Sequence, residues 1–155
     1  MPAKRERKYA LDANVFIDAF RSDERAAELE AFHAAFTPFE YLSAVVAMEL
    51  RAGTRGPDAA KLERHVLEPF ERRGRVVTPS YTAWTKAGEA LATLRERDGS
   101  SPAPGRRWQA FANDVLLAVS CREAGVIVVT SNSRDFERIA RVTGCAFAAP
   151  WPVPR

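Results

Sequence analysis

Hydrophobic residues follow two patterns along the chain: short apolar runs, and longer stretches with apolar residues three or four positions apart. The first pattern is typical of strands and the second of amphipathic helices. The clearest strand is at residues 126–130, a β-branched run of the kind that parallel sheets bury on both faces. The other strands are expected at residues 9–11, 40–43, 76–77 and near 147. The helices are expected at residues 15–20, 23–36, 45–52, 58–73, 80–98, 108–123 and 136–142.

Capping residues mark several of these boundaries. Asp23 and Ser80 are N-cap types and stand where two helices should begin. Gly74 and Gly125 stand where two helices should end, a common place for glycine. The sequence GSSPAPG at residues 99–105 is the only linker-like segment, and we expect it to be a loop rather than a domain boundary.

The alternation of strands and helices predicts an α/β fold, with a central, mostly parallel twisted β-sheet flanked by helices. A length of 155 residues suits one domain, so residues 1–155 are expected to form a single domain whose residues 1–8 are a basic tail. Functional sites in such sheets lie outside the carboxyl ends of the strands. The places to look are therefore Asp12, after the first strand, and residues 132–135, after the strongest one.

Composition narrows the class of protein. Hydrophobic residues at 46% and charged residues at 28% suit a soluble globular protein, and no apolar run approaches the length that a bilayer requires. The first ten residues, MPAKRERKYA, lack the apolar stretch of a secretion signal, so we expect a cytoplasmic location with no membrane partner. Cys121 and Cys145 have no metal-binding spacing and are expected to be buried, reduced thiols.

The charge balance points weakly toward a polyanionic partner. The net charge is +3 with a pI of about 9.1, and arginine outnumbers lysine by 19 to 4. Guanidinium groups bind phosphate in a bidentate manner, which favours nucleic acid. A solvated surface explains the same residues equally well, so charge alone does not decide.

Three acids stand in apolar surroundings: Asp12 in YALDANVFI, Glu49 in SAVVAMEL and Asp114 in FANDVLLAV. A carboxylate placed there loses hydration and must become neutral, accept hydrogen bonds or meet a cation. Each has a structural alternative: a helix N-cap for Asp12, a buried ion pair for Glu49, and a helix-dipole partner for Asp114. Together they would repel one another unless a cation lies between them, and Mg²⁺ or Mn²⁺ is the natural one.

The histidines argue against zinc. The chain has only two, His33 and His65, both in charged helical stretches where surface positions are expected. Clustered acids with a hard divalent metal suit phosphodiester hydrolysis. No GxSxG, GxxxxGK[ST] or GxGxxG sequence occurs, so a serine nucleophile, a P-loop and a dinucleotide site lack support.

Four segments resemble a known family. LDANVFID, SAVVAMELRAG, NDVLLAV and VVTSNSRDF, in this order, resemble the four motifs of the PIN domain, specifically of the VapC-like toxins. The APW that follows the last expected strand is also similar to the family's usual ending. The resemblance covers nearly the whole chain and implies a PIN-like fold.

Carried over by position, the resemblance implies catalytic, metal-binding acids at Asp12, Glu49 and Asp114, with Asn14 orienting the loop beneath the first. The fourth motif varies in the family between acid and amide. Here it would be lined by the supporting residues Thr130 and Asn132 and by the catalytic, metal-binding Asp135.

Whether Asn132 or Asp135 faces the metal stays open at this point. Asp135 would act through metal-bound waters while Asn132 fixes the loop by hydrogen bonds. The alternative for Asp135 is that it only complements the dipole of the following helix.

The resemblance further implies a Mg²⁺- or Mn²⁺-dependent endoribonuclease toxin that hydrolyses RNA and is neutralised by a cognate, VapB-like antitoxin. It also implies a homodimer, for which the apolar helix face carrying Trp84 and Leu91 is a candidate interface.

Three other functions remain to be weighed. A haloacid-dehalogenase-type phosphatase also begins with a strand ending in Asp, but it needs a second Asp where Asn14 stands and a late lysine that is absent. A receiver-like domain needs a lysine after its last strand, and Lys86 is the final lysine. A catalytically inactive PIN-like module that binds RNA or protein would not need all three core acids.

Overall fold

The computed structural model describes residues 6–98 and 106–152. Its strands are β1 (Lys8–Leu11), β2 (Glu40–Ser43), β3 (Val76–Val77), β4 (Val126–Val129) and β5 (Phe147–Ala148). They form one sheet in the order β3-β2-β1-β4-β5, and every neighbouring pair is parallel. The predicted α/β class is confirmed. All five expected strands form, within one residue of their expected positions.

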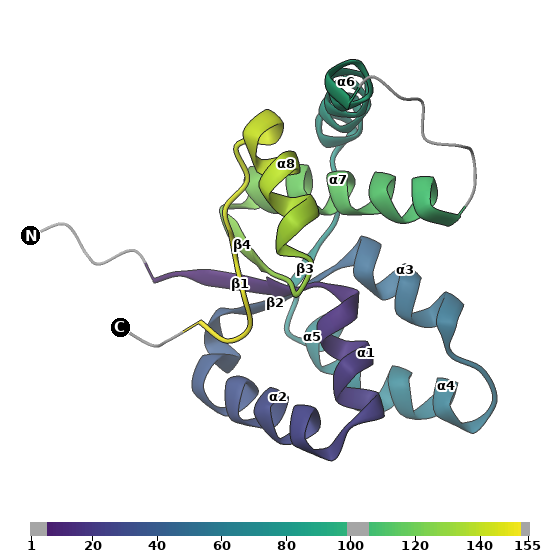
Figure 1. The fold of residues 1–155 in the computed structure, drawn as a ribbon. Helices are drawn as coiled ribbons and strands as arrows, with labels where there is room; N and C mark the ends of the chain where they lie inside the picture. The colour runs from purple at the N-terminus through teal and green to yellow at the C-terminus, as the bar shows by residue number, and fades with distance from the viewer. Residues whose placement is uncertain (1–5, 99–105, 153–155) are drawn as a thin grey trace, which may run out of the picture.

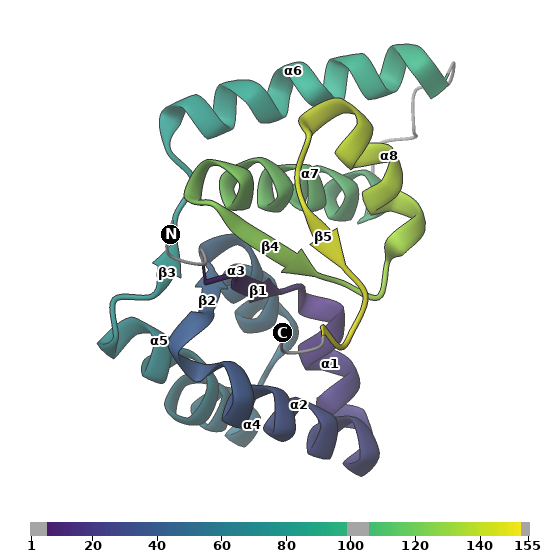
Figure 2. The same ribbon diagram turned by 90° about the vertical axis from the view of Figure 1, so that its left-hand side faces the viewer.

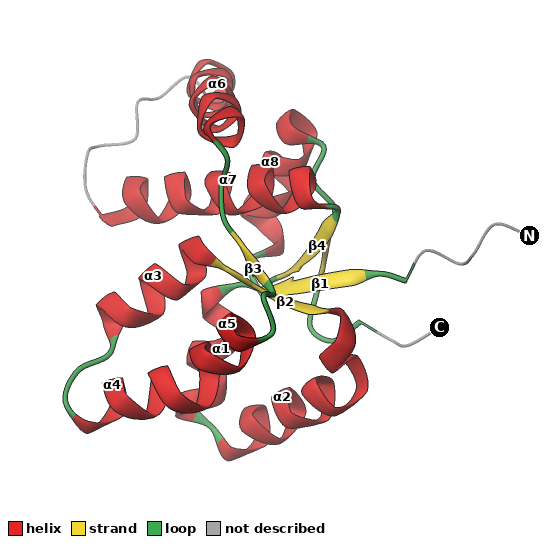
Figure 3. Ribbon diagram, turned by 180° about the vertical axis from the view of Figure 1, so that it is seen from behind, coloured by secondary structure: helices red, strands yellow, loops and turns green. Residues whose placement is uncertain are grey.

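Helices cover both faces of this sheet, which forms the middle layer (Figures 1 and 3). On one side lie α6 (Tyr81–Asp98), α7 (Arg106–Ala124) and α8 (Ser133–Thr143). On the other side lie α1 (Ala13–Arg21), α2 (Asp23–Phe36), α3 (Ala44–Gly53), α4 (Pro57–Lys61) and α5 (Glu68–Arg72).

α7 lies between the sheet and α6, which forms an outer layer (Figure 2). This position explains why every side chain from Val115 to Cys121 is buried, although an amphipathic helix buries only one face. Within the described ranges, no helix is long and apolar enough to cross a membrane. Cys121 of α7 and Cys145 of the α8–β5 loop are both buried and free, as expected.

Several helices differ from the sequence prediction: α1 begins at Ala13 rather than at residue 15, and α8 begins at Ser133 rather than at residue 136. Ser22, not Asp23, is the N-cap of α2, because the Ser22 hydroxyl accepts from the Arg25 backbone N–H. The helix expected over residues 58–73 is a continuous helical run whose middle, η2 (Leu62–Leu67), is π-helical. The expected loop at 99–105 lies outside the described residues, as do residues 1–5 of the expected basic tail.

The prediction of two surface histidines is half wrong. His65 is exposed, but His33 is half-buried and its Nδ1 lies 2.6 Å from Oε2 of Glu40. Glu40 is only 3% exposed, and its Oε1 has no hydrogen-bond partner among the described residues. Glu40 pairs in register with Tyr9 at the start of β2, so strand pairing draws this carboxylate into the interior.

One face of α6 packs on the core and leaves Trp84 outside it. Ala83, Ala87 and Leu94 are buried, but Trp84 is 59% exposed. The small alanines let α6 pack closely on α7 and turn the indole of Trp84 toward solvent.

Candidate active site

The strand order creates a switch point at the carboxyl ends of two neighbouring strands, and we call this edge of the sheet the crevice. Strands β2 and β3 lie in sequence on one side of β1. The chain then crosses over, so that β4 and β5 lie on the other side of β1. The strands β1 and β4 are therefore neighbours whose following helices, α1 and α8, diverge. Open α/β sheets bind ligands at such a switch point, and Asp12 and Thr130 follow directly on these two strands.

Asp12 is 3% exposed and is held by three donors. Its Oδ1 accepts from the Ala13 backbone N–H at 2.7 Å, which makes Asp12 the N-cap of α1. Its Oδ2 accepts from Thr130 Oγ1 at 2.8 Å and from Asn14 Nδ2 at 3.2 Å. Burial raises the pKa of Asp12 more than these hydrogen bonds lower it. The cap suggested as an alternative role is thus present, and the same carboxylate lies in the crevice.

Asn14 joins the loops that follow β1 and β4. Its Nδ2 donates to Thr130 Oγ1 at 3.3 Å, and its Oδ1 accepts from the Ser131 backbone N–H at 3.2 Å. The Thr130 hydroxyl in turn accepts from the Asn132 backbone N–H at 3.0 Å. The two loops are therefore held in one network around Asp12.

Glu49 reaches the crevice from α3 and is half-buried. Its Oε1 accepts from Asn113 Nδ2 of α7 at 2.9 Å. Burial raises the pKa of Glu49, the Asn113 hydrogen bond lowers it, and the charge of Asp12 raises it further. The proposed ion pair with a basic residue is wrong within the described residues, since Arg51 pairs instead with Glu63 and Glu71.

Asp114 lies in the middle of α7, so the alternative role as an N-terminal dipole partner is wrong. The pKa of this carboxyl is raised to about 8, first by burial and then by the charges of Asp12, Glu49 and Asp135. A hydrogen bond from Asn132 opposes these effects. Four acids from four different elements therefore lie close enough to act on one proton.

Asn132 and Asp135 both belong to this cluster. Asn132 Nδ2 donates to Asp135 Oδ2 at 3.0 Å, in addition to its hydrogen bond with Asp114. Arg138 Nη1 donates to the other oxygen of Asp135 at 3.3 Å. Asp135 also stands in the first turn of α8, where a carboxylate complements the helix dipole. The amide thus lies between two acids rather than replacing one of them.

Sequence analysis missed Asn113, which fixes Glu49. The only available signal was its place beside Asp114 in an otherwise apolar stretch, and a helical neighbour normally points to another face. Asn113 nevertheless faces α3, because α7 packs against other elements on several sides.

The side chains of the site offer the kind of ligand atom that a hard divalent cation binds. Carboxylate oxygens predominate, and such ions as Mg²⁺ bind through one or two carboxylates while they keep several waters. Among residues 6–98 and 106–152, no group of three or more acids, histidines or cysteines is arranged to hold a metal ion as its side chains stand. The arrangement therefore suits an ion that is largely hydrated, rather than one enclosed by protein ligands.

Comparisons with known proteins agree with this geometry. Residues 9–142 match the PIN domain family. The chain is 30% identical over 132 residues to a tRNA(fMet)-specific endonuclease VapC of Shigella flexneri, a match that spans 85% of this chain and 92% of that protein.

Two solved structures are similar as well. DNA-bound VapBC from Salmonella typhimurium is 25% identical with a TM-score of 0.66, over 93% of this chain and 98% of the other. FitAcB from Neisseria gonorrhoeae is 20% identical with a TM-score of 0.64, over 94% and 99% of the two chains, which shows a shared fold.

Proposed function

This chain belongs to the PIN domain family, and from that membership we propose that it is a metal-dependent endoribonuclease toxin restrained by a cognate antitoxin. The observation that carries the proposal is that four different elements bring Asp12, Glu49, Asp114 and Asp135 together, so that burial and charge raise the pKa of Asp114 to about 8. Three further acids raise it, which is the signature of carboxylates gathered around one point without enough positive charge.

Each acid has a role in the proposed reaction. Asp12 and Asp114 would hold Mg²⁺ or Mn²⁺, with Glu49 and Asp135 acting on it directly or through its waters. The bound ion would lower the pKa of a water and neutralise charge on the phosphate.

The polar neighbours orient these acids. Thr130 and Asn14 donate to Asp12 and keep its Oδ2 directed into the crevice. Asn113 does the same for Glu49, and Asn132 spans Asp114 and Asp135. Donors that favour the charged form help each carboxylate to stay ionised in a buried setting.

RNA is the proposed substrate and a VapB-like protein the proposed partner. The relative from Shigella flexneri is a tRNA endonuclease, and similar structures are VapBC complexes bound to DNA. A pI of about 9.1 agrees with a polyanionic substrate. An inactive PIN-like module would not require the retained acids, and the phosphatase alternative still lacks its second Asp at Asn14.

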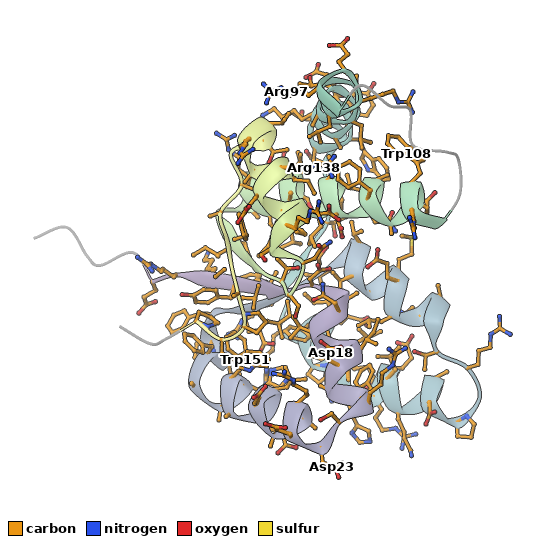
Figure 4. The ribbon with its side chains drawn as sticks, viewed as in Figure 1. Asp18, Asp23, Arg97, Trp108, Arg138 and Trp151 are labelled. Carbon is orange, nitrogen blue, oxygen red and sulfur yellow. The ribbon has the colours of Figure 1, made fainter. Side chains whose placement is uncertain are left out.

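The test is cleavage of total RNA with added Mg²⁺ or Mn²⁺, with and without excess EDTA. We expect cleavage that EDTA abolishes, and a fall of about 100-fold or more for Asp114→Asn. Asp23→Asn is the matched control, because Asp23 is exposed and lies at the opposite end of the molecule from Arg138 (Figure 4). Full cleavage in EDTA contradicts the metal mechanism, and no cleavage under any condition favours the inactive module.

A further inference from the structure

A second feature adjoins the acids and has no role in the chemistry described so far. A hollow of about 490 Å³ opens between α6, α7 and α8 and ends at Asp114, Asn132 and Asp135. Its outer part is lined by arginines and aromatic rings. We call it the α6–α8 hollow and define it by Arg95, Arg107, Trp108, Phe111, Asp114 and Arg138.

The aromatic side chains form a stripe that leads to the acids. Trp108, Phe111 and Asp114 are three residues apart on α7 and line the same hollow. The rings of Trp108 and Phe111 are 6.3 Å apart between centroids. Six residues of helix rise about 9 Å, so Trp108 and Asp114 lie on one side of α7 within two helical turns.

Arginines lie over both rings. The Arg95 guanidinium carbon is 4.9 Å from the centroid of Trp108, and that of Arg138 is 5.3 Å from the centroid of Phe111. Arg95 is exposed, and a guanidinium held against an indole offers a planar cationic group on which an unpaired base can stack. Figure 4 shows Trp108 and Arg138 in the part of the molecule where these three helices meet.

Charge is divided along the hollow. Arg95 and Arg107 line the outer, aromatic part, whereas Asp114 and Asp135 lie at the inner end, where Arg138 is paired with Asp135. Arg107 is exposed and forms no ion pair with another described residue. A phosphate is therefore attracted to the outer part, and it is repelled from the inner end unless a cation is bound there.

We propose that the α6–α8 hollow binds one unpaired nucleotide of a single-stranded RNA, with its base stacked at Trp108 and Arg95 and its phosphate paired with Arg107. The adjoining phosphodiester then lies at Asp114 and Asp135. A base inside a duplex is already stacked on both faces and cannot enter, so the hollow selects single-stranded segments. This inference rests on the proposed nuclease function for the identity of its ligand.

The first test measures affinity without cleavage. A short, fluorescently labelled single-stranded RNA is titrated with protein in EDTA, with Trp108→Ala, Trp108→Phe and Arg107→Gln as variants. Loss of a base stack should weaken binding about ten-fold or more in Trp108→Ala, and Trp108→Phe should restore most of it. Phe20→Ala and Arg73→Gln are the matched controls, because both side chains are exposed and lie outside the hollow. They should bind as the wild type does.

The second test separates this inference from the nuclease proposal. In Mg²⁺, Trp108→Ala should raise KM for single-stranded RNA about ten-fold while kcat changes much less. The reason is that the base stack is equally strong in the bound substrate and in the transition state. Wild-type cleavage with an unchanged KM in Trp108→Ala overturns the subsite and leaves the nuclease proposal intact. The absence of cleavage by the wild type, with Trp108-dependent RNA binding, overturns the nuclease and supports the subsite. If Trp108→Ala keeps its RNA affinity but no longer binds the antitoxin, the subsite is also overturned, since the hollow is then a protein-binding surface.

Discussion

At the scale of single residues, Asp114 links burial, charge and pH. Its pKa of about 8 lies far above the ordinary value of 3.8, so the folded protein binds this proton more tightly than the unfolded chain does. Stability from such a group is full below the unfolded pKa and falls as pH rises toward the folded pKa. Asp114 therefore makes the metal-free protein progressively less stable as the pH rises from about 4 to about 8.

The melting temperature of metal-free protein should consequently fall by several degrees between pH 5 and pH 8. Asp114→Asn carries no charge in either state, so its melting temperature should vary less over the same interval. Thermal unfolding in EDTA at several pH values checks this. Parallel curves of melting temperature against pH for the two proteins would show that burial and the acidic neighbours do not raise the pKa of Asp114.

Asp135 should contribute less to turnover than Asp114. Its two oxygens accept hydrogen bonds from Asn132 and Arg138, which suits a carboxylate that orients metal-bound water. We expect Asp135→Asn to lower kcat by about 10- to 100-fold, the scale of groups that act through a ligand, and less than Asp114→Asn does. Glu137→Gln, an exposed change on the same helix, is the control. Equal losses for Asp135→Asn and Asp114→Asn would contradict this ranking.

How far single residues could be predicted depended on their neighbours. Asp12 and Asp114 stood out because apolar residues surround them in sequence and the fold buries those residues. Glu40 did not stand out, since its burial comes from pairing beside Tyr9 and its partner His33 lies on the preceding helix. Contacts made between distant elements leave no local pattern.

At the scale of elements, α8 must end correctly if its first turn is to hold Asp135 in the crevice. Gly144 is the C-cap of α8, with φ at 69°, a left-handed conformation that strains other residues. A Cβ at this position would also meet the Arg122 guanidinium, which donates to the carbonyl of Thr143. Both effects act against any side chain here.

Gly144→Ala should therefore lower the free energy of unfolding by about 1–2 kcal/mol. Gly88→Ala is the matched control, because Gly88 lies inside α6 with open space around its Cα. That change should raise the free energy of unfolding by about 0.5–1 kcal/mol. Urea titration of both variants measures the difference, and equal effects of the two changes would show that α8 does not depend on the left-handed turn.

Strand and helix positions were largely predictable, since local periodicity and caps such as Ser80 determine them. The exceptions have tertiary causes. The π-helical turn of η2 lies under an ion-pair network in which Arg51 of α3 binds Glu63 and Glu71. Likewise, tertiary packing buries Ala83 and Ala87 of α6 and leaves Trp84 exposed.

At the scale of the whole molecule, α6 exposes two aromatic side chains. Tyr81 is 86% exposed and Trp84 is 59% exposed, and large apolar groups at such positions are typical of interfaces. We expect a homodimer formed through this face, and Trp84→Asp should yield a monomer. Phe20→Asp, which changes an exposed aromatic residue on α1, is the control and should stay dimeric. A wild-type monomer by light scattering at micromolar concentration contradicts the dimer.

We propose that Asp12, Glu49, Asp114 and Asp135 form one metal site, and proton release on metal binding tests this most directly. With a pKa of about 8, Asp114 is mostly protonated at pH 7 and must lose its proton to a bound cation. Calorimetric titration of Mg²⁺ at pH 7, in buffers with different ionisation enthalpies, counts the protons released. We predict a release approaching one proton per ion for the wild type and close to none for Asp114→Asn. Binding without proton release in the wild type, or equal release in both proteins, would contradict the account.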